Sequence, residues 1–594
     1  MPTDARHYPD AGSETFTRAG GLGPLSDRRG LTTMVAGART FSLEETFLSP
    51  QILNPPPTRH ALLAFLLALA AVLHIGTAGW GDLYDGAEGH FAGGAREMVE
   101  SGQWLVPANN GVPLLQTPPL TFWSIAASSK IFGVNATAAR LPIAFAMIGL
   151  VALTFLIGER LAGYWRGFAA GLILLCSGSS FVPGRIVAPD AIFALFLSGA
   201  LYCVIRGYQH RKFRRAWFAG VWFCAGLASL TKGLHAILYL AALCGLLAIF
   251  FREARLRFRP LLHWTNLLLF FAIVAPWFVW RLSEFPGFLL HPVSSSPRWT
   301  LVLLQVDWWF PTMFLVLPGF IFNPRKILRP DEVTLADRLP LVWLSAGLFF
   351  ELFFAQEPSA AIATAPAFAL LAAAAWQRTA RPLRAIGLVL AVVAGFSFVA
   401  IAWFRPAILG TLFDRPPNDA AWLSLRSLFQ IGVVSLLAGT TAALVLLKQR
   451  GEITLVLALA TMIPIGGCLI ESRARLAPFF SLADAARYLN PRLGRNGEVI
   501  FEGSIQSGSS LAFYLEKKFF LVNQLPGLLE KDAASQNKYL DEHFVLEAWD
   551  RSDPIYLIIA EDRLAHWRQL ITDRVHIYHQ VTTCGSRVIL SNQL

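Results

Sequence analysis

The sequence predicts a polytopic α-helical membrane protein of about thirteen transmembrane helices, followed by a small α/β domain near the C-terminus. Three observations predict this class: a mean hydropathy of +0.50, a composition that is 55% hydrophobic and only 15% charged, and apolar runs that recur along most of the chain. A helix needs about 20 apolar residues to cross the hydrocarbon core of a bilayer. This composition excludes a large soluble enzyme.

The expected spans share a high apolar content and few charged residues. They lie near residues 61–79, 137–157, 164–182, 188–205, 216–231, 234–251, 263–281, 300–322, 339–355, 359–376, 385–404, 427–447 and 453–471. Together they make a transmembrane domain, 59–471, whose first external loop is 80–122. Residues 1–58 are rich in Gly, Pro, Ser, Thr and Arg without a sustained period, and we expect a disordered cytoplasmic tail.

Basic residues between the spans orient the chain. They form clusters at residues 206–215, 252–259, 325–329, 378–384 and 448–450. With thirteen spans and an inside N-terminus, all of these clusters fall on the cytoplasmic side, as the positive-inside rule requires. The first external loop and the C-terminal segment then fall outside. The net charge of +11 is therefore explained mostly by orientation and predicts no nucleic-acid partner.

The C-terminal segment, residues 484–594, changes character. Strand and helix signals alternate in VIFEG, SSLAFYLEKK, FFLVNQ, PIYLIIA, EDRLAHWRQLITDR and VHIYHQ, which predicts a small soluble α/β domain. Residues 503–510, Gly-Ser-Ile-Gln-Ser-Gly-Ser-Ser, are either an anion cradle or a plain strand-to-helix turn, and we favour the turn. Cys584 is the only cysteine in this segment, so we expect no disulfide framework there.

The first external loop carries two candidate catalytic acids, Asp85 and Glu88. Acids held beside a membrane in an ordered loop are costly unless they pair, bind or react. If residues 89–99 form a helix, Glu88 lies at its N-terminus, where the helix dipole favours a carboxylate, so a capping role is the alternative. Two acids three residues apart favour a functional role.

Further charged groups lie where other spans begin or end. Asp190 starts an apolar stretch, where a helix-start carboxylate is the alternative to a functional acid. Arg185 is its candidate ion-pair partner or a phosphate ligand. Lys232 interrupts apolar sequence and needs an anion or a water-filled cavity, unless it snorkels to the interface. We expect His235 and His291 to be polar contacts on the same side.

Residues 89–123 read GHFAGGAREMVESGQWLVPANNGVPLLQTPPLTFW. This stretch resembles the first external loop of the bacterial GT-C glycosyltransferases, the group that contains the aminoarabinose transferase that modifies lipid A and the protein O-mannosyltransferases. The resemblance extends to ARLP at 139–142, RIVAPDAIF at 185–193 and TKG at 231–233, and it covers most of residues 60–594.

Enzymes of this family transfer a sugar from a polyprenyl-phosphate carrier to an acceptor at the outer membrane face. The resemblance therefore implies a multi-pass glycosyltransferase of the bacterial cell inner membrane with a periplasmic C-terminal domain. It implies a polyprenyl-phosphate sugar donor and a glycolipid, glycan or protein acceptor among membrane lipids. No cofactor is called for, and a divalent metal stays open. We expect catalytic roles for Asp85, Glu88 and Asp190, and substrate-binding roles for Arg185, Lys232, His291 and Gln116.

The chain departs from the family pattern at three places, one of which is the run FAQEPSAAIATAPAF at 354–368, which lacks the Lys-Pro and Tyr commonly seen there. The first acid of the family's Asp-Glu pair falls on Ala87, so Asp85 would have to serve from two residues away. The family's Glu-Lys before Pro-Pro is Gln116-Thr117 here. The alternative function is a non-catalytic polyprenyl-lipid binding protein or transporter built on the same fold. The retained Glu88 and Asp190 favour catalysis.

Overall fold

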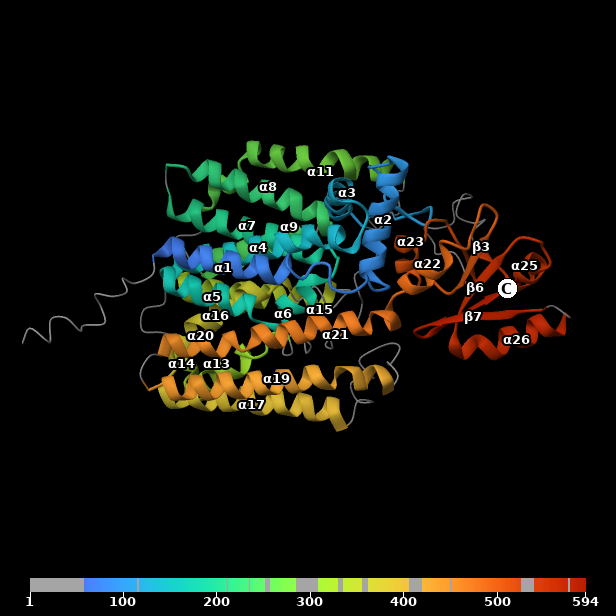
Figure 1. Ribbon diagram of the computed structural model, residues 1–594. Helices are drawn as coiled ribbons and strands as arrows, with labels where there is room; N and C mark the ends of the chain where they lie inside the picture. Colours follow the sequence, from blue (N-terminus) through green and yellow to red (C-terminus); the bar gives the residue numbers. More distant parts are fainter. Residues whose placement is uncertain are drawn as a thin grey trace, which may run out of the picture. The chain divides into compact units, whose positions relative to one another are not determined.

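Apolar helices make up most of the structure, a computed structural model (Figure 1). It describes residues 58–114, 117–210, 212–233, 235–250, 257–284, 308–328, 335–354, 362–404, 419–448, 451–524, 539–574 and 577–593. The expected tail, apart from Thr58, and the candidate residues Gln116 and His291 lie outside the described residues.

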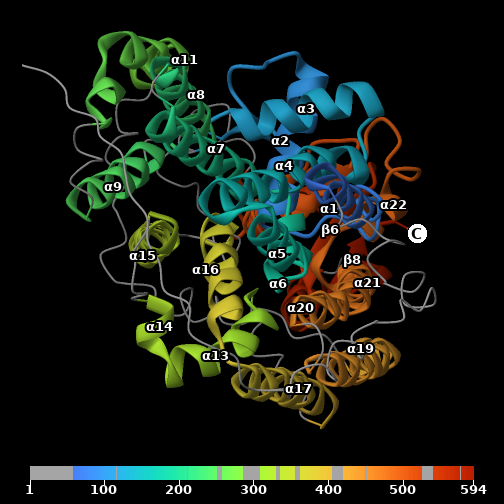
Figure 2. The same cartoon turned by 90° about the vertical axis from the view of Figure 1, so that its left-hand side faces the viewer.

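Most of the helices before the C-terminal sheet lie side by side over much of their length, as Figure 2 shows from one end. The helices before the sheet are α1 (Arg59–His74), α2 (Ala87–Ser101), α3 (Leu120–Phe132), α4 (Ala136–Ala162), α5 (Tyr164–Leu175), α6 (Gly178–Phe181), α7 (Asp190–Gln209), α8 (Arg214–Lys232), α9 (His235–Phe250), α11 (Trp264–Glu284), α13 (Thr312–Phe322), α14 (Pro324–Leu328), α15 (Leu335–Phe354), α16 (Ala365–Arg378), α17 (Arg381–Phe404), α19 (Asp419–Leu446), α20 (Gly451–Ala460) and α21 (Met462–Phe480).

Every predicted span overlaps a helix of the structure. Within the described residues, five helices are long and apolar enough to cross a membrane, or six if α5 and the bent segment Gly178–Arg185 are one span. The five are Ala136–Ala162, Asp190–Gln209, Trp264–Glu284, Trp422–Leu446 and Gly451–Phe480. A count of thirteen therefore stays a prediction. None of the predicted spans corresponds to α3, the helix that follows the Pro-Pro pair.

Small residues set the spacing of neighbouring helices. A Cβ added to Gly158 of α4 would lie 2.8 Å from the Cα of Gly167 on α5, so only glycine permits this approach of the two backbones. The N-terminus of α4 is capped by the side chain of Asn135, which accepts a hydrogen bond from the backbone nitrogen of Ala138 at 2.8 Å. These features fix α4, which carries Arg140 of the site described below.

The segment between α1 and α3 has its own structure. Helix α2 crosses the direction of α4, α7 and α8 in Figure 1 and ends at Gly102, whose φ of 73° is a left-handed cap. A short hairpin follows, with β1 (Ala108–Asn109) antiparallel to β2 (Val112–Pro113). Its turn residues Asn110 and Gly111 both have positive φ, at 55° and 76°, as a tight primed turn requires.

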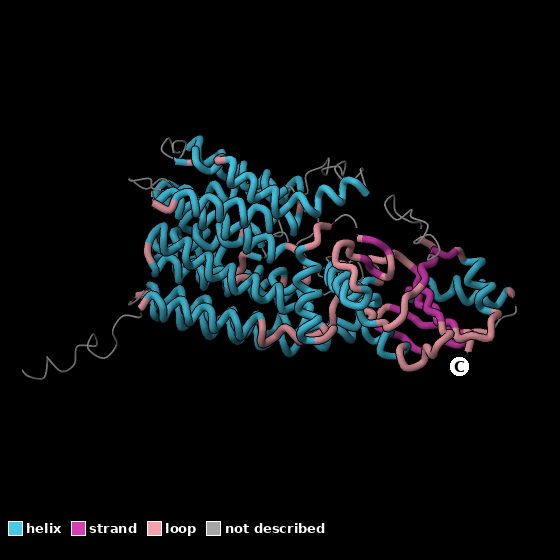
Figure 3. Tube along the Cα trace, turned by 90° about the horizontal axis from the view of Figure 1, so that it is seen from above, coloured by secondary structure: helices cyan, strands magenta, loops and turns pink. Residues whose placement is uncertain are grey.

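A six-stranded mixed sheet organises the C-terminal segment, where Figure 3 shows the strands gathered. Its elements are α22 (Ala483–Leu489), β3 (Glu498–Glu502), α23 (Ser509–Tyr514), β4 (Phe520–Val522), β5 (Tyr539–Leu540), α25 (Glu542–Trp549), β6 (Ile555–Ala560), α26 (Leu564–Asp573), β7 (His579–Cys584) and β8 (Arg587–Ser591). The strand order is β5-β4-β3-β6-β8-β7. Strands β5, β4, β3 and β6 are parallel, and β8 pairs antiparallel with both β6 and β7.

Alternating strand residues supply a core on each face of the sheet. Phe501 and Ile558 belong to one buried cluster, whereas Ile500 and Leu557 belong to the other. The α/β character of the segment follows the sequence pattern. The hairpin of β7 and β8 was not predicted from the sequence. The expected strand VHIYHQ, at 575–580, overlaps only the first two residues of β7, and no strand was expected at β8.

Candidate functional site

Glu88 lies in the first turn of α2, as the sequence predicts, and its side chain is only 2% exposed. Its carboxylate accepts hydrogen bonds from the backbone nitrogen of Tyr84 at 3.0 Å and from the Nη2 atom of Arg473 at 2.8 Å. Arg140 donates to the two carboxylate oxygens through Nε at 3.4 Å and Nη2 at 3.5 Å. The carboxylate is thus a buried junction of three chain segments rather than a solvated helix cap.

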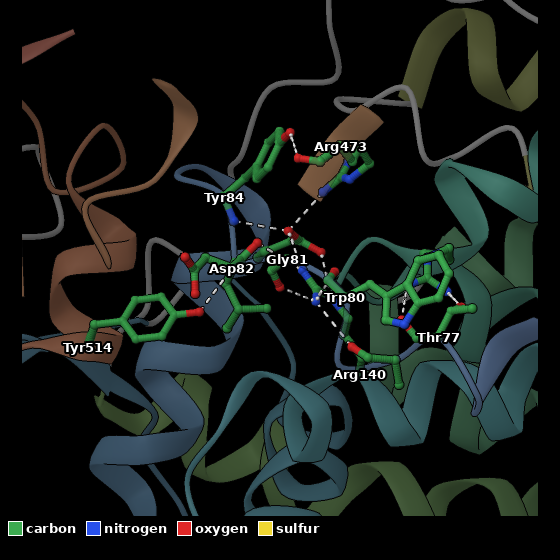
Figure 4. Close-up of polar contacts among 12 residues, drawn as sticks. Thr77, Trp80, Gly81, Asp82, Tyr84, Arg140, Arg473 and Tyr514 are labelled. Atoms are coloured by element: carbon green, nitrogen blue, oxygen red, sulfur yellow. Dashed lines mark hydrogen bonds and ion pairs between the residues drawn. The ribbon is translucent and has the colours of Figure 1, made fainter. Parts of the chain in front are cut away.

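Arg140 holds the chain between α1 and α2 through main-chain contacts (Figure 4). Beyond Glu88, its guanidinium donates to the carbonyl oxygens of Ala78 at 3.2 Å, Trp80 at 3.2 Å, Gly81 at 2.8 Å and Asp82 at 3.0 Å. One side chain therefore satisfies four acceptors of an irregular segment. Its donors are used for structure, which leaves it poorly suited to hold a substrate.

Arg473 reaches the same carboxylate from α21. Its guanidinium lies over the ring of Tyr84, with Cζ 4.2 Å from the ring centroid, and the Tyr84 hydroxyl donates to the Arg473 carbonyl at 2.6 Å (Figure 4). Burial alone would raise the pKa of Glu88, but the charges of Arg140 and Arg473 outweigh it and hold that pKa below its usual range. Glu88 is therefore ionised and is suited to positioning more than to accepting a proton.

Asp85 contacts the C-terminal segment. Its carboxylate accepts hydrogen bonds from the backbone nitrogen of Ser510 at 2.9 Å and from the Ser510 hydroxyl at 2.6 Å. The adjacent Gly86 nitrogen donates to the hydroxyl of Ser509 at 2.9 Å. Residues 503–510 thus form a strand-to-helix turn whose N–H and hydroxyl groups bind an anion from within the chain. The sequence reading anticipated the turn, but not that Asp85 would be the anion.

A second charged group forms where four helices begin or end. Asp190 is the first residue of α7 and makes an ion pair with Lys232, the last residue of α8. Glu351, near the end of α15, interacts electrostatically with both. Its carboxylate also accepts a hydrogen bond at 3.1 Å from the hydroxyl of Thr364, the N-cap residue of α16. Two carboxylates and one ammonium therefore meet among otherwise apolar helices.

Arg185 lies shortly before Asp190 in the sequence, but it contacts the chain just after the end of α1. Its guanidinium donates to the carbonyl oxygen of Thr77 at 2.5 Å and to the hydroxyl of the same residue. It also interacts electrostatically with Arg140, Arg473 and Glu88. These three guanidinium groups and one carboxylate form a cationic cluster. Asp190 is paired with Lys232, so the structure gives it a partner other than Arg185.

The sequence reading missed four residues of these groups: Arg140, Arg473, Glu351 and Thr364. The signal for Arg140 and Glu351 is a charge inside an apolar run, the criterion that selected Lys232. For His235 the structure describes only the backbone, at the start of α9. Within the part of the chain that is described, no three His, Cys, Asp or Glu side chains are grouped so that they would hold a metal ion.

Residues 116–280 match the family described as dolichyl-phosphate-mannose-protein mannosyltransferase. An uncharacterized protein of Aquifex aeolicus is 26% identical over 321 residues, which are 52% of this chain and 63% of that protein. An undecaprenyl phosphate-alpha-4-amino-4-deoxy-L-arabinose arabinosyl transferase of Shewanella sediminis is 30% identical over 170 residues, or 28% of this chain and 31% of the relative. The chain thus spans less than two thirds of these curated relatives.

The fold is similar to that of ArnT from Cupriavidus metallidurans, whose crystal structure holds undecaprenyl phosphate. The TM-score is 0.76 with 20% sequence identity, and the match covers 89% of this chain and 98% of that one. The apo structure of the same protein gives a TM-score of 0.75. Because the match covers 89% of this chain, it extends beyond the helical part into the C-terminal segment.

Proposed function

We propose that this chain, which is similar in fold and in part of its sequence to GT-C membrane glycosyltransferases, transfers a sugar from a polyprenyl-phosphate-linked donor to an acceptor. The acceptor is a lipid, a glycan or a protein at the outer face of the inner membrane. The donor class is supported by the ArnT structure, which contains undecaprenyl phosphate.

One observation carries this proposal: the ion pair of Asp190 with Lys232 beside Glu351. Charged side chains among apolar helices are expensive and are typical of functional sites. The pair also joins the two kinds of group that sugar transfer from a phosphate carrier needs. A carboxylate accepts the proton of the attacking hydroxyl, and a cation stabilises the phosphate leaving group.

We assign proton transfer to Asp190, because Glu88 is neutralised by two arginines and Asp85 is bound to Ser510. Lys232 binds the donor phosphate, and its side chain remains 26% exposed. Arg473, 22% exposed at the edge of the cationic cluster, is a second phosphate contact. Glu88 positions Arg473. Arg185, with two of its nitrogens directed at Thr77, adds to the positive potential at the cluster.

We further propose thirteen spans, with the C-terminal segment in the periplasm. Support comes from the positions of the charged groups: Asp190 and Arg140 lie near the starts of α7 and α4, whereas Lys232 and Arg473 lie near the ends of α8 and α21. All four fall on the outer side in the thirteen-span topology. Alkaline phosphatase fused to the C-terminus is then active in intact cells, and a fused green fluorescent protein stays dark. The reverse pair of results contradicts this orientation.

A non-catalytic polyprenyl-lipid binding protein is the second candidate. It is favoured by Ala87, which occupies the place of the family's first acid, and by the contact that commits the neighbouring Asp85 to Ser510. The two candidates differ in what the protein does to a bound donor, since only an enzyme consumes it.

Mass spectrometry of lipids that co-purify with the full chain separates the two. The variant is Asp190→Asn, and the control is Asp573→Asn, an exposed aspartate at the end of α26. A polyprenyl-phosphate sugar retained by Asp190→Asn but not by the wild type or the control supports transfer. Bare polyprenyl phosphate in equal amounts on all three supports the binding protein. Absence of polyprenyl lipid from all three contradicts both candidates.

A further inference from the structure

The C-terminal sheet carries a hollow of about 500 Å³ that the proposed transfer reaction does not use. Its walls include Glu502, Ser507, Asn523, Glu542 and Arg563. Glu502 is the last residue of β3, and Asn523 directly follows β4. Another wall residue, Ala560, is the last residue of β6. The hollow therefore opens at the carboxyl ends of three adjacent parallel strands.

The strand order makes this edge a topological switch point. From β3 the chain passes through α23 to β4 on one side, and after β5 it returns through α25 to β6 on the other side of β3. In open α/β sheets, ligands bind in the crevice outside the carboxyl ends of the strands where the connections diverge in this way. Glu502 at the end of β3 lies at that divergence.

The polar groups of the hollow are already held in place by one another. Asn523 Nδ2 donates to Oε1 of Glu502 and to Oε1 of Glu542, each at 2.8 Å. Arg563 also bridges the two acids, through Nε to Glu502 at 3.0 Å and Nη2 to Glu542 at 3.4 Å. Trp567 Nε1 fixes the second oxygen of Glu502 at 3.0 Å. A ligand therefore meets an ordered ring of donors and acceptors, which lowers the entropic cost of binding.

The charges of the hollow select the ligand class. Two carboxylates, Glu502 and Glu542, face two guanidinium groups, Arg563 and Arg587, so the net formal charge is zero. Burial alone would raise the pKa of Glu542, but hydrogen bonds from His566 and Asn523 outweigh it and lower that pKa, so the carboxylate stays an acceptor at neutral pH. Such a wall suits neutral hydroxyl groups, which donate to the carboxylates and accept from the guanidinium and amide groups.

We propose that this hollow binds a neutral sugar unit through Glu502, Asn523, Glu542 and Arg563. A phosphate would meet the two carboxylates, and an apolar ligand would leave the charged walls desolvated without partners. The proposal does not depend on transferase activity, because it requires no reacting group and lies apart in sequence from the acids assigned to transfer.

The test is sugar binding by the full chain in phospholipid nanodiscs, since maltoside detergents carry a sugar themselves. The probes are galactose, mannose, N-acetylglucosamine and maltotriose, observed by saturation-transfer difference NMR. We expect at least one probe to bind, and Glu542→Gln to weaken it about tenfold through loss of a charged acceptor. The matched control is Glu547→Gln, which changes an exposed residue of the same helix, α25.

A second variant guards against misfolding. Asn523 has a φ of 60°, a conformation that glycine adopts without strain, so Asn523→Gly removes the bridging amide and keeps the backbone. It should weaken the same probe. The proposal is overturned if no probe binds the wild type at millimolar concentration, if both folded variants bind as tightly as the wild type, or if inorganic phosphate displaces the probe competitively.

Discussion

The carboxylate of Asp85 accepts two hydrogen bonds from Ser510, one from the backbone nitrogen at 2.9 Å and one from the hydroxyl at 2.6 Å. The pair joins the segment between α1 and α2 to the first turn of α23, across 425 positions of sequence. An acid that the sequence marks for chemistry is thereby engaged in holding two segments together. Its partner is a turn that by itself resembles an anion site.

Asp85→Ala should lower the free energy of unfolding by about 1–3 kcal/mol, because it leaves the Ser510 donors without their acceptor. Transfer per folded molecule should remain close to that of the wild type. Thermal unfolding in nanodiscs and a transfer assay corrected for the folded fraction measure the two effects, with Asp573→Ala as the control. Unchanged stability together with lost transfer would instead return Asp85 to a catalytic role.

Glu88→Gln should be more damaging, by about 3–5 kcal/mol, because it leaves the charges of Arg140 and Arg473 without their buried counter-charge. The pKa of Glu88 is lowered in the folded protein from its usual value of 4.5. Its contribution is therefore fully present above about pH 4.5 and is lost as the pH falls through the folded-state pKa. Unfolding midpoints of both proteins across this range test the sign. A gap between them that stays constant below pH 4.5 would contradict it.

Asp190→Asn should reduce kcat by a factor of about 100 to 10,000, the usual contribution of general acid–base catalysis. Expression should fall less than for Glu88→Gln, because Lys232 is 26% exposed and keeps Glu351 as a neighbouring acid, and donor binding should persist because the amide keeps the shape of the side chain. Single-turnover assays with purified protein measure the chemical step, and Asp573→Asn again serves as the control. Wild-type turnover by Asp190→Asn would remove Asp190 from the reaction.

Lys232→Met should weaken donor binding by about tenfold or more, and should weaken acceptor binding less. The reason is that the Lys232 ammonium, which is paired with Asp190, is the cation assigned to the donor phosphate. The control is Lys448→Met, an exposed lysine that follows α19. Donor and acceptor affinities measured separately distinguish this from a general loss of fold. Equal donor affinities for the wild type and Lys232→Met would mean that Lys232 only reaches the membrane interface.

Local patterns made some of the site predictable. The expected helix at residues 89–99 placed Glu88 at a helix N-terminus, and the structure has Glu88 in the first turn of α2. Apolar runs located the helices that carry Asp190 and Lys232. Partners far along the chain were beyond such patterns. Arg473 lies 385 positions from Glu88, and the local sequence around either residue does not indicate that the two side chains are in contact. The roles of Ser510 and Glu351 depend in the same way on tertiary packing, which a single sequence does not display.

The antiparallel hairpin of β7 and β8 was missed for a different reason. Its first strand, His579–Cys584, mixes polar and β-branched residues and carries an irregular register between Gln580 and Thr582. The irregular register interrupts the two-residue alternation that identifies a strand. The central strands β3, with its apolar middle Val499–Phe501, and β6, which is apolar throughout, were recognised correctly.

Arg140 binds the segment between α1 and α2 only through main-chain oxygens and the Glu88 carboxylate. Substitution of Trp80 or Asp82 therefore leaves these main-chain acceptors in place, although a change of Asp82 also removes its ion pair with Arg487. Gly81 is the exception, since its φ is 75° and a Cβ there would lie 2.7 Å from the Cα of Ala474. The path of the chain from α1 to α2 is therefore set by Arg140 and Gly81 more than by the side chain of Trp80.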